Sequence, residues 1–274
     1  MMEEKQTEIS TLGEFGLIDR LTKDIEHVND STLTGVGDDC AVMSYKDTDV
    51  LVPTDLLVEG VHFDLTYVPL KHLGYKAAVV NFSDIYAMNG HPRQITVSLA
   101  ISKRFTVEHI EELYSGIRLA CEIYGVDLVG GDTTSSRAGL VISITCIGDA
   151  PKDRIVYRSG AHDTDLICVS GDLGSAYMGL QLLEREKVAS AGQKDFVPQF
   201  QGKEYLIERQ LKPEARRDII ETLAKAGIMP TAMMDVSDGL SSELLHICKA
   251  SNVGCRVYED RIPIDYQTAL MAEE

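Results

Sequence analysis

Length, composition and charge limit what this chain can be. Its 274 residues are closer to two domains than to one, at roughly 150 residues per domain. With 44% hydrophobic and 25% charged residues, its composition is that of a globular protein and excludes a disordered or fibrous chain. The 26 Lys and Arg against 43 Asp and Glu give a net charge of −17, which argues against a binder of nucleic acid or of anionic membranes.

Targeting signals are not evident either. The first ten residues are acidic and lack the basic and apolar regions of a secretory signal, and no apolar run approaches the roughly 18 residues that span a bilayer. None of the six cysteines forms a C-x-x-C pair. We therefore expect reduced thiols and a cytoplasmic protein.

The first 150 residues are predicted to mix helices and strands. Helices are predicted over residues 12–27, 69–88 and 107–124, and strands over 40–43, 50–53, 93–101, 127–129 and 140–147. The last of these strands is expected to end in a turn at Gly148-Asp149-Ala150-Pro151. This order predicts an α/β or α+β domain over residues 1–150.

A second α/β domain is predicted over residues 151–274. Its strands are expected at 166–169, 231–234 and 254–258, and its helices at 174–183, 214–226 and 240–250. The polar segment 184–203 lies between two of them, and Ala191-Gly192 marks a loop within it. The chain ends inside what resembles a helix start, so we expect this domain to be incomplete.

Aspartates recur where apolar strands are predicted to end. They stand in Gly37-Asp38-Asp39, Thr54-Asp55, Gly130-Gly131-Asp132 and Asp235-Val236-Ser237-Asp238-Gly239. Ligands of α/β sheets gather at strand ends. Each motif has a plainer explanation: Asp38, Asp39 and Asp132 suit ordinary turns, and Asp238 could cap the helix that follows.

Asp84 is the most informative single residue. Apolar residues recur at helical spacing along 69–88, at Leu73, Ala77, Val80 and Ala87. Asp84 falls in this stripe, which an amphipathic helix buries. A buried carboxylate must be paired, protonated or bound to a metal, and no Lys or Arg stands one turn away.

Carboxylates and hydroxyls are hard oxygen ligands that suit Mg²⁺, Ca²⁺ or Mn²⁺. Because Mg²⁺ takes few carboxylates and completes its shell with water and phosphate oxygens, so many aspartates suggest several ions around a polyphosphate such as ATP. The P-loop, dinucleotide-binding and protein-kinase motifs are all missing from the sequence. A nucleotide site here must have another architecture.

Six sequence blocks together resemble the thiamine-monophosphate kinase family. They are GDDCAV at 37–42, TDLLVEGVHF at 54–63, KAAVVNFSDIYAM at 76–88, LVGGDTT at 128–134, RSG at 158–160 and DVSDGL at 235–240. The VEGVHF segment separates this family from its fold relatives, which include aminoimidazole ribonucleotide synthetase. The resemblance implies ATP-dependent conversion of thiamine monophosphate to thiamine diphosphate. It also implies a homodimer whose N-terminal sheets pair into a barrel.

The resemblance also implies site residues. Mg²⁺ ligands are implied at Asp39 (with Asp38 as the alternative), Thr54, Asp55, Asp84, Asp132, Asp235 and Asp238. ATP contacts are implied at Tyr114, Gly131, Asp132, Arg158 and Ser237, and a thiamine monophosphate contact at His62. From the residues alone, a lone His62 is more often structural. No general base is expected among these residues.

Two departures from the family pattern stand out. The family has a metal-binding serine where this chain has Pro53, and it continues past residue 274 with further substrate contacts. Two other functions stay open: a fold relative that phosphorylates another substrate, and an acidic Mg²⁺- or Ca²⁺-binding module that senses nucleotide without turnover.

Overall fold

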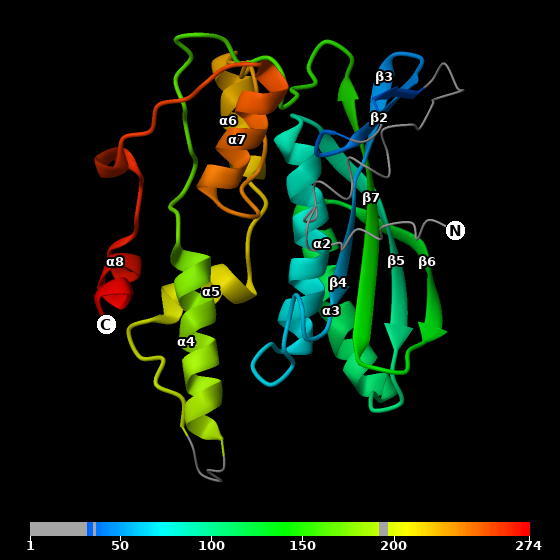
Figure 1. Cartoon of the computed structure of the whole chain (residues 1–274). Coiled ribbons are helices and arrows are strands. Elements are labelled where there is room, and N and C mark those ends of the chain that lie inside the picture. The colour runs from blue at the N-terminus through cyan, green and yellow to red at the C-terminus, as the bar shows by residue number, and fades with distance from the viewer. Residues whose placement is uncertain (1–31, 35–36, 192–196) are drawn as a thin grey trace, which may run out of the picture.

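The computed structural model describes residues 32–34, 37–191 and 197–274 (Figure 1). The predicted helix over 12–27 lies outside the described residues. The N-terminal part is a sheet with two helices on one of its faces, and the C-terminal part is a layer of helices beside them (Figure 1). The mixed α/β class expected for the N-terminal part is therefore confirmed, and the strands of the described residues do not close into a barrel within the chain.

One seven-stranded sheet forms the N-terminal part, in the order β1-β2-β3-β7-β5-β6, with β4 also paired to β7. Its strands are β1 (Thr32–Thr34), β2 (Ala41–Tyr45), β3 (Thr48–Val52), β4 (Thr54–Val58), β5 (His91–Ile101), β6 (Asp127–Ser135) and β7 (Leu140–Pro151). Only the pair β5–β6 is parallel. The strand-end turns predicted for Asp55, Asp132 and 148–151 are wrong, because these residues pair within β4, β6 and β7.

Pro53 marks the break between β3 and β4, which lie one after the other along the same edge of β7. β3 pairs with Gly148–Pro151, whereas β4 pairs with residues 141–145. A proline donates no backbone hydrogen bond and therefore suits this break. Its carbonyl oxygen accepts the N–H of Cys146 (3.1 Å). After this break, Thr54 and Asp55 begin the new strand β4.

Two helices, α2 (Leu70–Ala87) and α3 (Val107–Tyr124), cover one face of the sheet (Figure 1). Both were predicted from the sequence and are confirmed. Alternate residues of β7 from Leu140 to Cys146 are fully buried under them. The Thr106 hydroxyl caps α3 by accepting the N–H of His109, and Gly125 ends the helix with a φ of 71°. These contacts fix α2, and with it Asp84, over the sheet.

The second part is helical in the described residues. Its helices are α4 (Ser175–Ser190), α5 (Glu204–Leu211), α6 (Arg217–Ala226), α7 (Leu240–Ser251), the short 3₁₀ helix η1 (Glu259–Arg261) and α8 (Tyr266–Glu273). The polar segment 184–203 contains the end of α4, whose C-cap residue is Ala191, where a loop was predicted, and α5 was not predicted.

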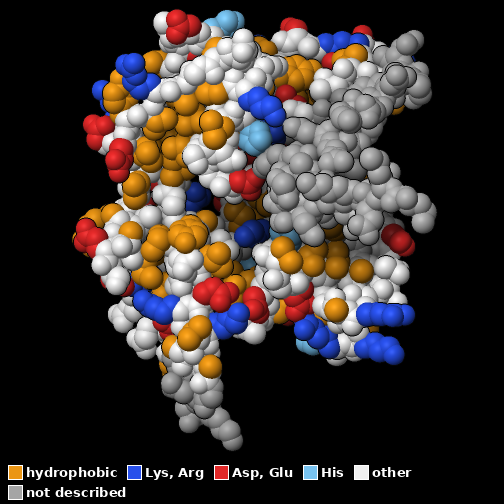
Figure 2. All heavy atoms as spheres, viewed as in Figure 1, with side chains coloured by type: hydrophobic (Ala, Val, Ile, Leu, Met, Phe, Trp, Pro, Cys, Tyr) orange, Lys and Arg blue, Asp and Glu red, His pale blue; other side chains and the backbone are white. Residues whose placement is uncertain are grey.

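The strands predicted over 166–169, 231–234 and 254–258 are wrong. None of these segments pairs with another strand among the described residues, and a strand needs a partner for its backbone hydrogen bonds. Leu166 is 89% exposed and Tyr258 51% exposed. Figure 2 shows hydrophobic side chains gathered on this part of the surface.

Buried polar contacts join the two parts. The hydroxyls of Tyr75 and Tyr124 both donate to Oε2 of Glu214 (2.7 Å each), and Lys76 donates to the carbonyl of Gln210 (3.2 Å). No helix among the described residues is long and apolar enough to cross a membrane. All six cysteines are free thiols.

Candidate metal and nucleotide site

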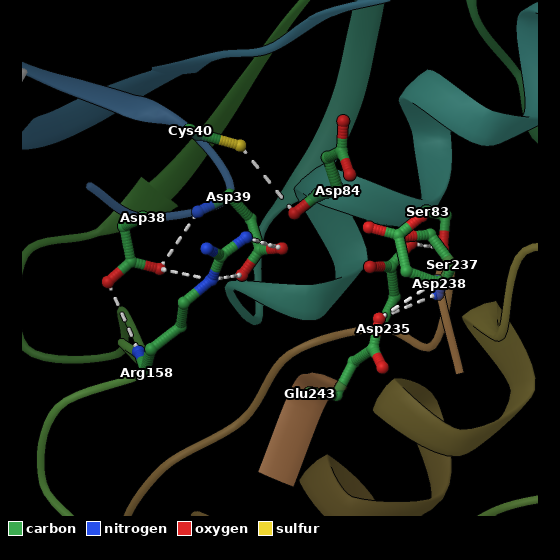
Figure 3. Close-up of polar contacts among 10 residues, drawn as sticks. All are labelled: Asp38, Asp39, Cys40, Ser83, Asp84, Arg158, Asp235, Ser237, Asp238 and Glu243. Atoms are coloured by element: carbon green, nitrogen blue, oxygen red, sulfur yellow. Dashed lines mark hydrogen bonds and ion pairs between the residues drawn. The ribbon is translucent and has the colours of Figure 1, made fainter. Parts of the chain in front are cut away.

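Three aspartates from distant parts of the sequence meet beside the C-terminal half of α2 (Figure 3). Asp39 precedes β2, Asp84 lies in the last turn of α2, and Asp235 lies in the segment before α7. Each offers a carboxylate oxygen within 4.8 Å of the other two. The side chain of Asp39 is only 2% exposed, and residues Asp84 and Asp235 are partly buried. We refer to Asp39, Asp84 and Asp235 as the aspartate cluster.

The carboxylates of this cluster disfavour one another's charge. Burial raises the pKa of Asp84 to about 9, and the charges of nearby aspartates add to the effect. Burial also raises the pKa of Asp235 to about 6, although the hydroxyl of Ser83 opposes this by donating to its Oδ2 (2.7 Å). Burial raises the pKa of Asp55, whose charge acts on both Asp84 and Asp235. Asp55 therefore lies close to the cluster.

Arg158 is paired with the cluster. Its guanidinium donates to both carboxylate oxygens of Asp39 (2.7 and 3.1 Å), and its backbone N–H donates to Asp38 (3.1 Å). Burial acts to lower the pKa of Arg158, but the hydrogen bonds and charges of Asp39 and Asp38 outweigh it and raise that pKa. For Asp38, burial dominates and raises the pKa. One cation thus faces several carboxylates, and the site keeps an excess of negative charge.

The segment that carries Asp235 is held by Glu243 of α7 (Figure 3). Oε1 of Glu243 accepts the N–H groups of Ser237 (3.3 Å) and Asp238 (2.9 Å). Asp238 does not cap α7, because its N-cap residue is Gly239, which makes no side-chain cap bond. The capping explanation for Asp238 is therefore wrong.

Tyr114, Gly131 and Asp132 lie together in a second place. They line an open depression of about 520 Å³ on β6, with Leu128, Val129, Gly130 and Thr133. A side chain at Gly131 would place its Cβ only 1.8 Å from the carbonyl oxygen of Val97, so glycine is required for this close pairing of β6 with β5. Three residues expected at ATP are thus neighbours, and Asp132 lies in this depression outside the aspartate cluster.

The sheet register connects the two places. Asp55 pairs with Ile144, Ile144 with Val97, and Val97 with Gly131. Three strand spacings of about 4.8 Å put the Cα atoms of Asp55 and Gly131 about 14 Å apart along one row of the sheet. An elongated ligand with a phosphate end and an aromatic end suits two such places.

The remaining expected residues lie as follows. The Thr54 hydroxyl donates to the carbonyl of Ile144 (3.1 Å) and contacts the hydroxyl of Thr145 (3.0 Å). Because residues alternate along a strand, Thr54 faces away from the side of Asp55. His62 lies in an exposed turn after β4, where its Nδ1 accepts the N–H of Val58 (3.0 Å). A positive charge on His62 acts to lower the pKa of Asp55, so His62 lies near Asp55.

This donor set fits a hard divalent cation. Carboxylate oxygens alone make up the aspartate cluster, and Mg²⁺ prefers such ligands together with water and phosphate oxygens. A divalent ion between these carboxylates removes the repulsion that raises the pKa of Asp84. The geometry accounts for Asp39, Asp84, Asp235 and the nearby Asp55 as one site.

Sequence reasoning missed Ser83 and Glu243. Ser83 directly precedes Asp84, and its orientation toward Asp235 depends on packing between α2 and the segment before α7. A glutamate in the first turn of α7, after a helix start without a capping side chain, was the available signal for Glu243. Arg158 was expected at ATP, and its pairing with Asp39 was not foreseen.

The chain is similar to known proteins over most of its length. It matches the family "AIR synthase related protein, N-terminal domain" over residues 37–150 and "AIR synthase related protein, C-terminal domain" over residues 164–273. Thiamine-monophosphate kinase of Bacillus subtilis is 37% identical over 254 residues, covering 92% of this chain and 75% of that protein. The enzyme of the same name from Aquifex aeolicus is 35% identical over 266 residues, covering 97% and 80%.

Solved structures agree with the sequence relatives. The structure of AaThiL complexed with AMPPCP and TMP superposes with a TM-score of 0.85 at 34% identity, covering 98% of this chain and 80% of that one. A thiamine monophosphate kinase structure from Aquifex aeolicus gives a TM-score of 0.78 at 32% identity, covering 97% and 82%. With this identity over most of both partners, the chain belongs to the thiamine-monophosphate kinase family, within the AIR synthase related proteins.

Proposed function

We propose that this chain phosphorylates thiamine monophosphate to thiamine diphosphate with ATP, and that the aspartate cluster holds the Mg²⁺ required. The observation that carries the proposal is the meeting of Asp39, Asp84 and Asp235 within 4.8 Å in a chain of this family. The related structure with AMPPCP and TMP supports the choice of both substrates. Bound Mg²⁺ supplies charge neutralisation for phosphates and for the transferring group.

The chain's own residues have distinct parts in this proposal. Asp39, Asp84 and Asp235 hold the metal, with Asp55 beside them. The depression on β6 is lined by Tyr114, Gly131 and Asp132, and we place the rest of the nucleotide there. The Cα of Gly131 lies about 14 Å from the Cα of Asp55 along the sheet. Asp132, Asp238, Thr54 and Asp38 stay predicted as further ligands, and the number of ions is not fixed by the proposal.

Arg158 and His62 face the substrates in different ways. Arg158 donates to the carboxylate of Asp39, and we infer that a bound phosphate competes for its guanidinium. His62 uses Nδ1 to accept a backbone N–H, so its Nε2 carries the proton of the neutral ring. That N–H can donate to a phosphate oxygen of thiamine monophosphate.

No general base is needed for the transfer. The nucleophile is a phosphate oxygen of the substrate, whose second pKa is about 6, so it is mostly a dianion at neutral pH. The difficulty is to bring two anions together, and the pairing of carboxylates with divalent ions addresses it. We propose direct in-line transfer without a phosphoenzyme.

The predicted homodimer rests on the sheet. Strand β6 is exposed along its whole length, and Leu56 on β4 is 55% exposed. Strand β6 thus has an edge that no other strand of the described residues covers, which supports pairing with a second copy through the sheet. Light scattering after gel filtration should give twice the chain mass. A cytoplasmic location likewise stays a prediction.

Steady-state assays test the proposal. Thiamine diphosphate formation should require ATP, thiamine monophosphate and Mg²⁺, and chelation of the metal should abolish it. ADP release with substrates of aminoimidazole ribonucleotide synthetase but not with thiamine monophosphate would favour the fold-relative alternative. ATP binding without turnover in any of these mixtures would favour the nucleotide sensor.

A further inference from the structure

Glu243 is a buried carboxylate for which neither the proposed chemistry nor the motif match has a use. It lies in the first turn of α7 and is only 4% exposed. It makes no ion pair among the described residues, and its Oε2 has no hydrogen-bond partner there. Burying such a group costs free energy unless its hydrogen bonds compensate. Its contacts should therefore show what the burial achieves.

Those contacts are backbone groups of the segment that carries Asp235. Oε1 of Glu243 accepts two N–H groups, from Ser237 at 3.3 Å and from Asp238 at 2.9 Å (Figure 3). Because one oxygen accepts both N–H groups, Glu243 restrains the backbone at two successive residues.

The segment has few other restraints. Residues 235–239 form neither helix nor strand, and the N-cap residue Gly239 has a φ of 116° and makes no side-chain cap bond. The carboxylate of Asp235 is held by the hydroxyl of Ser83, 2.7 Å away. Ser83 thus anchors the side chain, whereas Glu243 anchors the backbone two and three residues later.

We propose that Glu243 is a positioning residue, which fixes the backbone of residues 237 and 238 so that Asp235 reaches Asp39 and Asp84. The inference deepens the proposed function and rests on metal binding at the cluster. Without Glu243, the segment can move. Metal binding must then order the segment, and the free energy needed to do so lowers the metal affinity. Replacement of a group that orients a metal ligand typically lowers metal affinity or activity by roughly 10- to 100-fold.

The experiment compares Glu243→Ala and Glu243→Gln with a matched control, Glu186→Ala. Glu186 is also buried (7% exposed) and its Oε2 accepts the N–H of Gln199 (2.8 Å), but it lies on α4, outside the cluster. Two measurements are made on the full chain. Hydrogen exchange of the Ser237 and Asp238 amides is followed without metal, and Mn²⁺ affinity is measured by calorimetry.

Glu243→Ala should speed exchange at both amides and weaken Mn²⁺ binding, each by about tenfold. Glu243→Gln should stay within about threefold of the parent chain in both, because the amide oxygen still accepts both N–H groups. Glu186→Ala should lower the melting temperature without changing either quantity. If Glu243→Ala is insoluble, Glu243→Asp replaces it, because the shorter side chain cannot reach both amides. The Glu243→Asp protein should then bind Mn²⁺ more weakly than the Glu243→Gln protein.

Unchanged amide exchange in Glu243→Ala, or a lower melting temperature with Mn²⁺ affinity like that of Glu186→Ala, would overturn the inference. Equal Mn²⁺ affinity of the Asp and Gln variants would do the same. Failure of the proposed function has a different signature: the parent chain itself would bind no Mn²⁺. Faster exchange in the Ala variant would then still show that Glu243 holds the segment.

Discussion

Replacing Asp84 with asparagine should separate a metal ligand from a structural aspartate. Asparagine resembles the protonated carboxyl in size and cannot ionise. In the folded chain, burial and neighbouring negative charges raise the pKa of Asp84 from 3.8 to about 9. The free energy of unfolding of the metal-free protein is therefore reduced at every pH at which this carboxyl is ionised in the unfolded chain. Asp84→Asn should therefore stabilise the metal-free protein, whereas loss of a structural aspartate would destabilise it.

The pKa gives the size of the effect. Each pH unit above the unfolded value of 3.8 removes about 1.4 kcal/mol from the stability of the parent chain, until the pH reaches the folded pKa of about 9. At pH 7 this amounts to about 4 kcal/mol as an upper bound. Local relaxation and water entry around the charge reduce it, and we expect about 2 kcal/mol. For a chain of this size, that raises the melting temperature by about 4 °C.

The sign fixes the pH dependence. Because the folded pKa lies above the unfolded one, the contribution of Asp84 to stability falls as the pH rises from about 4 to about 9. The advantage of Asp84→Asn should thus be small at pH 4.5 and grow toward pH 8. Thermal unfolding with chelator, at several pH values, measures it. The exposed Asp260 provides a control, since Asp260→Asn should show no such trend.

Activity should move in the opposite direction. With saturating Mg²⁺, Asp84→Asn should lower turnover by about 100-fold or more, the scale of losing one electrostatic stabiliser. A metal-free variant that melts several degrees below the parent chain would refute the reasoning. A stability gain that does not change with pH would also refute it, because the gain could not then come from an ionising carboxyl.

Three further predictions follow from the same geometry. Arg158→Ala should destabilise the metal-free protein by about 2 kcal/mol in urea titrations, because it leaves the buried carboxylates of Asp38 and Asp39 without their cation, and saturating Mg²⁺ should restore part of the loss. Mn²⁺ affinity should fall at least tenfold from pH 7 to pH 5 in calorimetry, because Asp235, whose pKa is about 6, takes up a proton in that range; an affinity constant over this range would contradict it. Gly131→Ala should lower the melting temperature, because its Cβ would lie 1.8 Å from the carbonyl oxygen of Val97, whereas Gly130→Ala meets nothing within 4 Å and should melt like the parent chain.

The sequence predicted the N-terminal part well because its elements are local. The run of apolar residues that forms α2, and the cap at Thr106 with Gly125 at the end of α3, are set by neighbours along the chain. The same reasoning failed for residues 166–169 and 254–258. Apolar and β-branched residues give a segment strand propensity, but a strand exists only where another strand completes its hydrogen bonds.

The site divides in a similar way. Asp84 could be singled out from the sequence because a carboxylate within an apolar stripe is costly whatever surrounds it. Its partners could not be derived from local physics, since Asp39 and Asp235 come from segments far along the chain. The pairing of Arg158 with Asp39, and the hold of Ser83 and Glu243 on the segment of Asp235, depend on how α2 and α7 pack. Residue types and spacing thus determined which groups can bind a hard cation, and only tertiary packing, which sets distances and burial, decided which of them share one.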